Sequence, residues 1–229
     1  MSMQKKLKVR GLVMLAGFFV LLGVIFTPVF PGNQNGLDYM DNLFNMISKG
    51  SVYFIPASKE DSKAFAGTTI EVSFSMVDDK QAKSTAELYR KSGAEASVDG
   101  TTVNVKGDVA AILQSSLEDA DYLFNNNGTP ITAKYGIGEK ETLYYWWKSF
   151  GGVTKDLNMQ KKFKEAKIFD AVKKKAIEPA YNYYGVESGH YKDYLFLIVA
   201  ALAFYVIYTL WYGFGIMYLF EGFGMNISH

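Results

Sequence analysis

The sequence contains no cysteine and only two histidines among its 229 residues. Without cysteine the chain forms no disulfide, and thiolate zinc sites, iron–sulfur clusters and thiol nucleophiles are excluded. Two imidazoles are too few for a multi-histidine metal centre, and they make a histidine-based catalytic triad a poor expectation. The formal net charge of +1 gives no reason to expect nucleic acid as a partner. We therefore expect no cofactor, no metal site and no catalytic residue.

Apolar residues are concentrated in two uncharged runs, residues 11–30 and 194–220. Each run is long enough to cross a bilayer, which takes about 20 apolar residues as a helix. The first run follows four basic residues and no acid: Lys5, Lys6, Lys8 and Arg10. Because basic flanks stay in the cytoplasm, we expect both termini inside and the central part outside. A cleaved signal peptide is the alternative for the first run, but no A-x-A cleavage pattern follows it.

The region between the two runs has the pattern of one α+β domain. Residues 67–136 read as strand, helix, strand, strand, helix, strand, and Asp99-Gly100 supplies the turn of a hairpin. This order predicts a ferredoxin-like βαββαβ domain, an antiparallel four-stranded sheet with both helices on one face. The strand that begins at Thr68 is expected to be central in this sheet, and the last strand is expected at residues 129–136. The other face of the sheet would carry Glu71, Ser73, Ser75, Asn104, Lys106, Thr132 and Lys134.

The predicted organisation has seven segments. They are a cytoplasmic basic N-terminus (1–10), a first transmembrane helix (11–30), a helix and connector (31–66), the ferredoxin-like domain (67–136), a helical region (137–192), a second transmembrane helix (193–220) and a cytoplasmic tail (221–229). The fold class is thus α+β, with two transmembrane helices bracketing an extracytoplasmic domain.

Four consecutive aromatic residues stand out in the helical region: Tyr144, Tyr145, Trp146 and Trp147. Such a cluster could hold a sugar or a quinone ring. We favour a core helix whose outer aromatics lie at a membrane boundary, where Trp and Tyr are enriched.

Two charged features allow both a functional and a structural interpretation. Eight lysines against three acids in residues 155–175 could contact anionic lipid, at about 1 kcal/mol for each Lys near the surface, or could form a solvated helix face. His190, with Glu187 three residues before it, has a spacing that could help to bind a metal. We favour an exposed interfacial histidine there.

Both predicted membrane helices carry a stripe suited to helix packing. Spacings of three and four place Ala201, Tyr205, Tyr208, Tyr212 and Gly215 on one face of the second helix. In the first helix the corresponding stripe is Ala16, Val20, Gly23 and Thr27. Small residues let membrane helices approach closely, and hydroxyls bond across the contact. We therefore predict that the tyrosines face protein, either the first helix of the same chain or another subunit. A proton or ion path lined by hydroxyls is the alternative, but the helix lacks an ionisable residue.

These observations favour a non-enzymatic accessory or scaffold subunit of a larger complex in a bacterial inner membrane. Its expected partners are other membrane-protein subunits or further copies of this chain, with the lipid bilayer around it. A ligand-binding sensor or transport component is the first alternative. An extracytoplasmic enzyme that relies on carboxylates is the second, although no pair among the many Asp and Glu residues is singled out for acid–base work.

Overall fold

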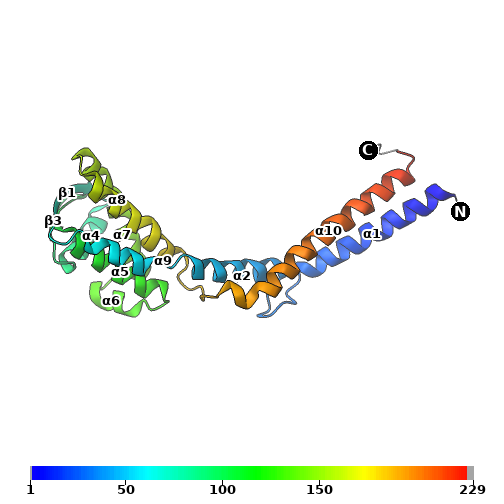
Figure 1. The fold of residues 1–229 in the computed structure, drawn as a ribbon, viewed down its shortest axis with the longest axis horizontal. Coiled ribbons are helices and arrows are strands. Elements are labelled where there is room, and N and C mark those ends of the chain that lie inside the picture. Colours follow the sequence, from blue (N-terminus) through cyan, green and yellow to red (C-terminus); the bar gives the residue numbers. More distant parts are fainter. Residues whose placement is uncertain (1, 226–229) are drawn as a thin grey trace. The chain divides into compact units, whose positions relative to one another are not determined.

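The structure is a computed structural model that describes residues 2–225 (Figure 1). Its contacts divide the chain into two units. One unit consists of the two ends of the chain, up to Ile47 and from Gly189 onward, and the other is Ser48–Ser188. The division falls within helix α2 (Gly36–Ser51). The last four residues of the predicted tail, including His229, lie outside the described residues.

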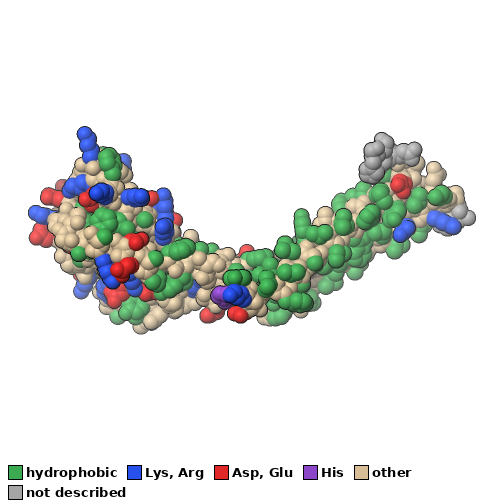
Figure 2. All heavy atoms as spheres, viewed as in Figure 1, with side chains coloured by type: hydrophobic (Ala, Val, Ile, Leu, Met, Phe, Trp, Pro, Cys, Tyr) green, Lys and Arg blue, Asp and Glu red, His purple; other side chains and the backbone are tan. Residues whose placement is uncertain are grey.

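The unit formed by the chain ends is built on two long helices, α1 (Met3–Ile25) and α10 (Leu195–Gly222), with a 3-10 turn, η2 (Tyr191–Tyr194), before α10. By length and composition both helices are able to cross a membrane. They are not core helices of a soluble domain, because only 6% and 0% of their most apolar windows is buried. Figure 2 shows their surface covered by hydrophobic side chains, with Lys and Arg at the N-terminal end of α1.

The two helices pack side by side (Figure 1), so that the basic end of α1 meets the last turn of α10. Lys8 Nζ lies 4.3 Å from the centre of the Phe223 ring, and the Arg10 guanidinium lies 4.4 Å from that of Tyr218. The helices are therefore antiparallel, and the start of α1 and the end of α10 lie at the same end of the pair.

The unit Ser48–Ser188 contains a three-stranded antiparallel sheet in the order β1-β3-β2. Its first elements are α3 (Ile55–Lys63), β1 (Thr69–Ser75), α4 (Asp79–Lys91), β2 (Glu95–Asp99), β3 (Thr102–Asp108) and α5 (Val109–Phe124). The predicted alternation in β1 is confirmed, since Ile70, Val72 and Phe74 are buried and the residues between them are exposed. Residues 55–63, expected as part of an irregular connector, form helix α3 instead.

The predicted fourth strand is wrong, because residues 129–135 form helix α6 (Thr129–Tyr135). Pro130 occupies the first turn, where a missing N–H costs nothing, and Gly136 ends the helix with a left-handed φ of 71°. Ile131 and Tyr135 fit a strand period of two, but they are also four apart, which is a helix spacing. Thr132 and Lys134, assigned to the polar sheet face, therefore lie on α6.

The edge of β1, where a fourth strand would pair, is covered by side chains from the C-terminal end of α7 (Glu139–Met159). The carboxylate of Asp156 accepts the N–H of Ser73 at 3.0 Å, and the side-chain amide of Gln160 donates to the carbonyl of Glu71 at 2.8 Å. β1 is thus an edge strand, and our expectation of a central one is also wrong. At the opposite edge Arg90 donates twice to the carbonyl of Ala96 in β2.

Helix α7 crosses β1 so closely that a glycine is required at the crossing. A Cβ on Gly152 would lie 2.6 Å from the Cβ of Phe74. Mid-helix glycine costs about 1 kcal/mol relative to alanine, and this contact explains its presence within α7.

The chain then continues through α8 (Phe163–Val172), a π-helical turn, η1 (Lys173–Ile177), and α9 (Glu178–Asn182). Pro179 lies in the first turn of α9, directly after the π-helical turn. Helices α4, α5, α7 and α8 share the core of this unit with the buried face of the sheet.

Candidate functional site: an aromatic pocket and a buried carboxylate

Helix α7 divides the four consecutive aromatic residues between two environments. Tyr145 and Trp146 are buried in the core, whereas Tyr144 is half-buried and Trp147 is exposed. Consecutive residues of a helix are turned by about 100° from one another, so four in a row cannot share one face. The core interpretation thus holds for the middle pair, and the outer pair lies on the surface.

The buried pair is anchored by polar contacts. Trp146 donates from Nε1 to the carboxylate of Asp119 on α5 at 2.8 Å. The same carboxylate accepts the hydroxyl of Tyr135 at 2.7 Å and the ammonium of Lys134 at 3.0 Å. Asp119 is only 1% exposed. It therefore ties α5, α6 and α7 together inside the core.

Burial raises the pKa of Asp119, and the hydrogen bond from Tyr135 and the charge of Lys134 oppose this effect. Burial and the adjacent carboxylate also raise the pKa of Tyr135, so its hydroxyl remains a donor. A carboxylate with three donors and almost no exposure has no free face for a substrate. We assign Asp119 a structural role.

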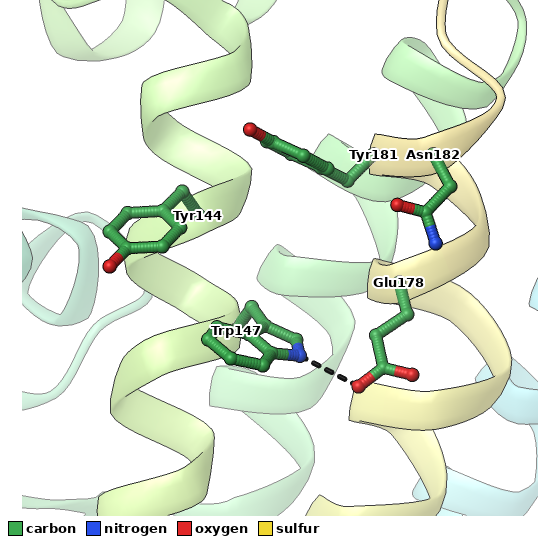
Figure 3. A pocket seen from close by; sticks show the side chains of 5 residues that line it. All are labelled: Tyr144, Trp147, Glu178, Tyr181 and Asn182. Atoms are coloured by element: carbon green, nitrogen blue, oxygen red, sulfur yellow. Dashed lines mark hydrogen bonds between the residues drawn. The ribbon is translucent and has the colours of Figure 1, made fainter.

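The outer pair, Tyr144 and Trp147, lines a pocket between α7 and α9 (Figure 3). The pocket has a volume of about 320 Å³, near the lower end of the roughly 300–1,000 Å³ typical of ligand sites. We call it the aromatic pocket and define it by five residues: Tyr144, Trp147, Glu178, Tyr181 and Asn182. Its walls are mostly aromatic, with one carboxylate and one amide, which is the usual composition of a small-molecule site.

The geometry of the aromatic pocket is set by one hydrogen bond and one ring pair. Trp147 Nε1 donates to Glu178 Oε1 at 2.7 Å, as the dashed line in Figure 3 shows. The rings of Tyr144 and Trp147 are stacked, with centroids 6.0 Å apart and planes at 27°. From the opposite helix Tyr181 extends toward α7 (Figure 3). The second oxygen of Glu178 has no hydrogen-bond partner among residues 2–225.

A second hollow, of about 250 Å³, lies beside Lys49. Burial lowers the pKa of this lysine, and the charge of Glu187 opposes the shift. Its ammonium donates to Asn126 Oδ1 at 3.1 Å and to the carbonyl of Val186 at 2.5 Å, and Asn126 also accepts the N–H of Gly185. Lys49 therefore joins the end of α2 to the α5–α6 turn and to the segment after α9, which is a structural role.

In the helix pair, the predicted stripe of α10 is divided between contact and exposure. The hydroxyl of Tyr208 donates to the carbonyl of Phe18 on α1 at 2.9 Å, and the two rings stack 4.2 Å apart. Gly215 is buried against α1, and Ala201 is half-buried. Tyr212 is 40% exposed, although its ring contacts that of Phe18, and Tyr205 is 67% exposed.

The predicted stripe of α1 does not take part in the contact with α10, because all four of its residues, Ala16, Val20, Gly23 and Thr27, are exposed within this chain. The contact uses Gly11, Met14, Leu15, Gly17 and Phe18 instead. Residues 16 and 18 differ by about 200° around a helix, so the predicted stripe lies on the opposite side of α1. The helix contact that we predict for the α1 stripe would therefore be made with another subunit.

His190 is exposed, stacks on Tyr191 and accepts the N–H of Lys192 through Nδ1 at 3.3 Å. Within the part of the chain that the structure describes, no three His, Asp or Glu side chains are grouped so that they could hold a metal ion.

No protein-family model, curated protein or solved structure matches this chain, so its function must be inferred from its own geometry.

Sequence reasoning missed three of the five pocket residues, Glu178, Tyr181 and Asn182. Their spacing of three and four was a usable signal, because it places them on one face of a helix. What the sequence did not give is the pairing of that face with the outer face of α7.

Proposed function

We propose that this protein is a non-enzymatic accessory or scaffold subunit of a larger complex in a bacterial inner membrane. In this proposal α1 and α10 cross the membrane as an antiparallel pair. The unit Ser48–Ser188 then lies outside the cytoplasm, and the basic N-terminus and the C-terminal tail lie inside.

One observation carries the proposal: the helix pair satisfies only part of its polar surface. Tyr208 bonds to α1, but the hydroxyls of Tyr205 and Tyr212 have no hydrogen-bond partner among the described residues. In hydrocarbon each unsatisfied polar group costs several kcal/mol. A helix of another subunit, packed on this flank, would remove that cost.

The exposed stripe of α1 supports the same conclusion. Its small residues, Ala16 and Gly23, allow close approach of a further helix. A Cβ placed on Gly23 would meet no atom within 4 Å, so this surface is open within the chain. The partners would be other membrane-protein subunits or further copies of this chain.

Site-specific photo-crosslinking in intact membranes tests the scaffold role. Crosslinkers at Tyr205, Tyr212 or Val20 should capture a protein, and mass spectrometry of the adduct identifies it. Matched positions at Leu202 and Val206, which are also exposed, should label lipid instead. Equal labelling of lipid from all five positions would reject the scaffold role.

Cysteine labelling tests the orientation, since the chain has no native cysteine. A cysteine at Ser97, which is exposed on β2, should react with an impermeant thiol reagent once any outer membrane is permeabilised. A cysteine at Ser2 should react only after the inner membrane is lysed. The reverse pattern would invert the proposed topology.

The aromatic pocket favours a second candidate, a ligand-binding sensor or transport component. The two functions are compatible, because the residues that carry them lie in different units.

A further inference from the structure

We propose that the aromatic pocket binds an organic cation with a methylated ammonium group, such as a choline-type headgroup. This inference does not rest on the scaffold role, since Tyr144, Trp147, Glu178, Tyr181 and Asn182 all belong to the unit Ser48–Ser188.

The first argument is the sign of the charge that the walls favour. The faces of Trp and Tyr rings carry partial negative charge and attract cations, most strongly those that are weakly hydrated. Glu178 adds a negative charge, which the nearby ammonium of Lys174 partly offsets, and no lysine or arginine lines the pocket. An anionic ligand would meet repulsion from both the rings and the carboxylate.

The second argument is that the carboxylate of Glu178 is held in place by a hydrogen bond to only one of its two oxygens. The hydrogen bond from Trp147 holds one oxygen of Glu178 at 2.7 Å. The other oxygen has no hydrogen-bond partner among residues 2–225. It can therefore pair with a cation while the indole beside it supplies a ring face.

The third argument comes from a contact that the chain makes with its own cation. Lys140 Nζ lies 4.7 Å from the centre of the Tyr181 ring, well within the 6 Å reach of a cation–π contact. Lys140 is not among the residues that line the pocket. This contact shows that an ammonium is stable on a ring of the pocket wall, and a ligand cation would displace Lys140 or use the rings of Tyr144 and Trp147.

The size and the arrangement of the pocket limit the ligand class further. A volume of about 320 Å³ suits a headgroup rather than an extended chain. The rings come from two helices, α7 and α9, rather than forming one flat platform of the kind on which a sugar ring stacks. Asn182 is the single amide among the lining residues, which is few polar groups for a sugar with many hydroxyls.

Titration calorimetry on the full chain in detergent, at constant ionic strength, tests the proposal. Choline chloride should bind and saturate. Its uncharged carbon isostere, 3,3-dimethylbutan-1-ol, has the same shape and should bind much more weakly, and glucose should not bind. Equal binding of the isostere, or binding of glucose but not choline, would overturn the proposal.

Variants assign the binding to this pocket. Trp147→Leu should weaken choline binding about fivefold or more, because it removes the strongest ring, and Trp147→Phe should retain most of it. Glu178→Gln removes the charge but keeps an acceptor for Trp147, so it should also weaken choline. Glu95→Gln, at an exposed carboxylate on β2, is the matched control and should have no effect. An unchanged affinity in Glu178→Gln or Trp147→Leu, with an unchanged thermal melt, would place the binding elsewhere and reject the assignment.

Reconstituted nanodiscs distinguish the two sources of such a group. If the ligand is a lipid headgroup, phosphatidylcholine in a phosphatidylglycerol nanodisc should compete with free choline and lower its apparent affinity. If the ligand is a free solute, nanodiscs of phosphatidylglycerol alone and nanodiscs that also contain phosphatidylcholine should give the same choline affinity. Loss of choline binding in both kinds of nanodisc would overturn the proposal.

Discussion

The two units of this protein differ in whether their tyrosine hydroxyls have hydrogen-bond partners within the chain. In the unit Ser48–Ser188, buried tyrosine hydroxyls find partners within the chain: Tyr89 bonds to Ser149 and Tyr135 to Asp119. In the helix pair Tyr208 does so, but the hydroxyls of Tyr205 and Tyr212 have no hydrogen-bond partner among residues 2–225. The first unit therefore satisfies these hydroxyls internally, whereas the helix pair leaves two of its hydroxyls open to lipid, water or another protein.

The apolar surfaces differ in the same way. The core of Ser48–Ser188 encloses its large side chains, with Trp146, Phe150 and Phe169 fully buried. On α10, Phe196 is 86% exposed and Leu202 is 60% exposed. A soluble domain rarely presents so large a continuous apolar surface, so lipid or protein must cover that helix. Substitutions in each unit test this contrast.

The largest effect is expected from Asp119→Ala. This change leaves the donors of Trp146 and Tyr135 without an acceptor in the core, and each unsatisfied group costs about 1–3 kcal/mol. We expect the free energy of unfolding to fall by roughly 2–5 kcal/mol in urea denaturation followed by near-UV circular dichroism. Glu118→Ala is the control, because that side chain is 56% exposed and should matter by less than about 0.5 kcal/mol. A loss below 1 kcal/mol for Asp119→Ala would contradict the structural role.

The pH dependence of stability follows from the same carboxyl. Since burial raises the pKa of Asp119 in the folded protein, the unfolded chain releases this proton at lower pH than the folded chain does. Stability from this group is fully present below the unfolded pKa, about 3.9, and is lost as pH rises through the raised folded pKa. The difference in stability between the parent and Asp119→Asn should therefore vary with pH in that window and be constant above it. A difference that does not vary there would mean that the folded pKa is not raised.

The next largest effect should appear in the helix pair with Gly11→Ala. A Cβ at Gly11 would lie 2.7 Å from the backbone nitrogen of Leu219, so the helices must separate. Overpacking of this kind costs about 1–3 kcal/mol. Spin labels at Val13 and Phe214, both exposed, should report a longer or broader distance by electron paramagnetic resonance. Gly23→Ala is the matched control, and a similar change in both variants would remove the case for close packing at Gly11.

How much of this could be predicted from sequence depended on the range of the interactions involved. The strand period of Ile70, Val72 and Phe74 and the two apolar runs are local patterns, and they identified strand β1 and the presence of two long apolar helices. The prediction for residues 129–135 was wrong because a seven-residue segment with Ile131 and Tyr135 fits both the strand period and the helix period. Pro130 in the first turn and Gly136 at the end favour a helix. No local sequence pattern predicts that Asp156 and Gln160 cover the edge of β1, because these contacts join residues more than eighty positions apart.

The candidate site shows the same limit. The four aromatic residues 144–147 were visible in the sequence, but their division between core and surface follows from the phase of α7 against the sheet. The other half of the pocket, Glu178 and Tyr181, lies more than thirty residues away. In the helix pair, spacings of three and four place the residues of each stripe on one helix face. The spacing does not say which face of one helix contacts the other, because two apolar helices offer several nearly equivalent faces.

A smaller effect is expected from uncovering the sheet edge with Asp156→Ala. The N–H of Ser73 then loses its acceptor but gains access to water, so the loss should be about 0.5–1.5 kcal/mol. The exposed edge should also promote self-association at high concentration, which light scattering detects. Asp156→Asn keeps an acceptor and should restore most of the stability. Asp61→Ala, an exposed carboxylate on α3, is the control, and a loss equal to that of Asp156→Ala would show that edge coverage is not the cause.

The smallest effects, and the sharpest contrast, come from the tyrosines of α10. Tyr208→Phe removes the bond to the Phe18 carbonyl and should weaken the helix pair by about 0.6 kcal/mol, an average for such bonds in membranes. Tyr205→Phe and Tyr212→Phe should leave the pair unchanged, because neither hydroxyl has a hydrogen-bond partner among residues 2–225. They should instead reduce the fraction of co-purifying partner, measured by native mass spectrometry after gentle extraction. Phe is at least as apolar as Tyr, so membrane insertion is preserved and any loss reports the hydroxyl alone. If the Tyr205 and Tyr212 double variant retains its partners as the parent does, these tyrosines are incidental and the outward face of α10 is a lipid surface.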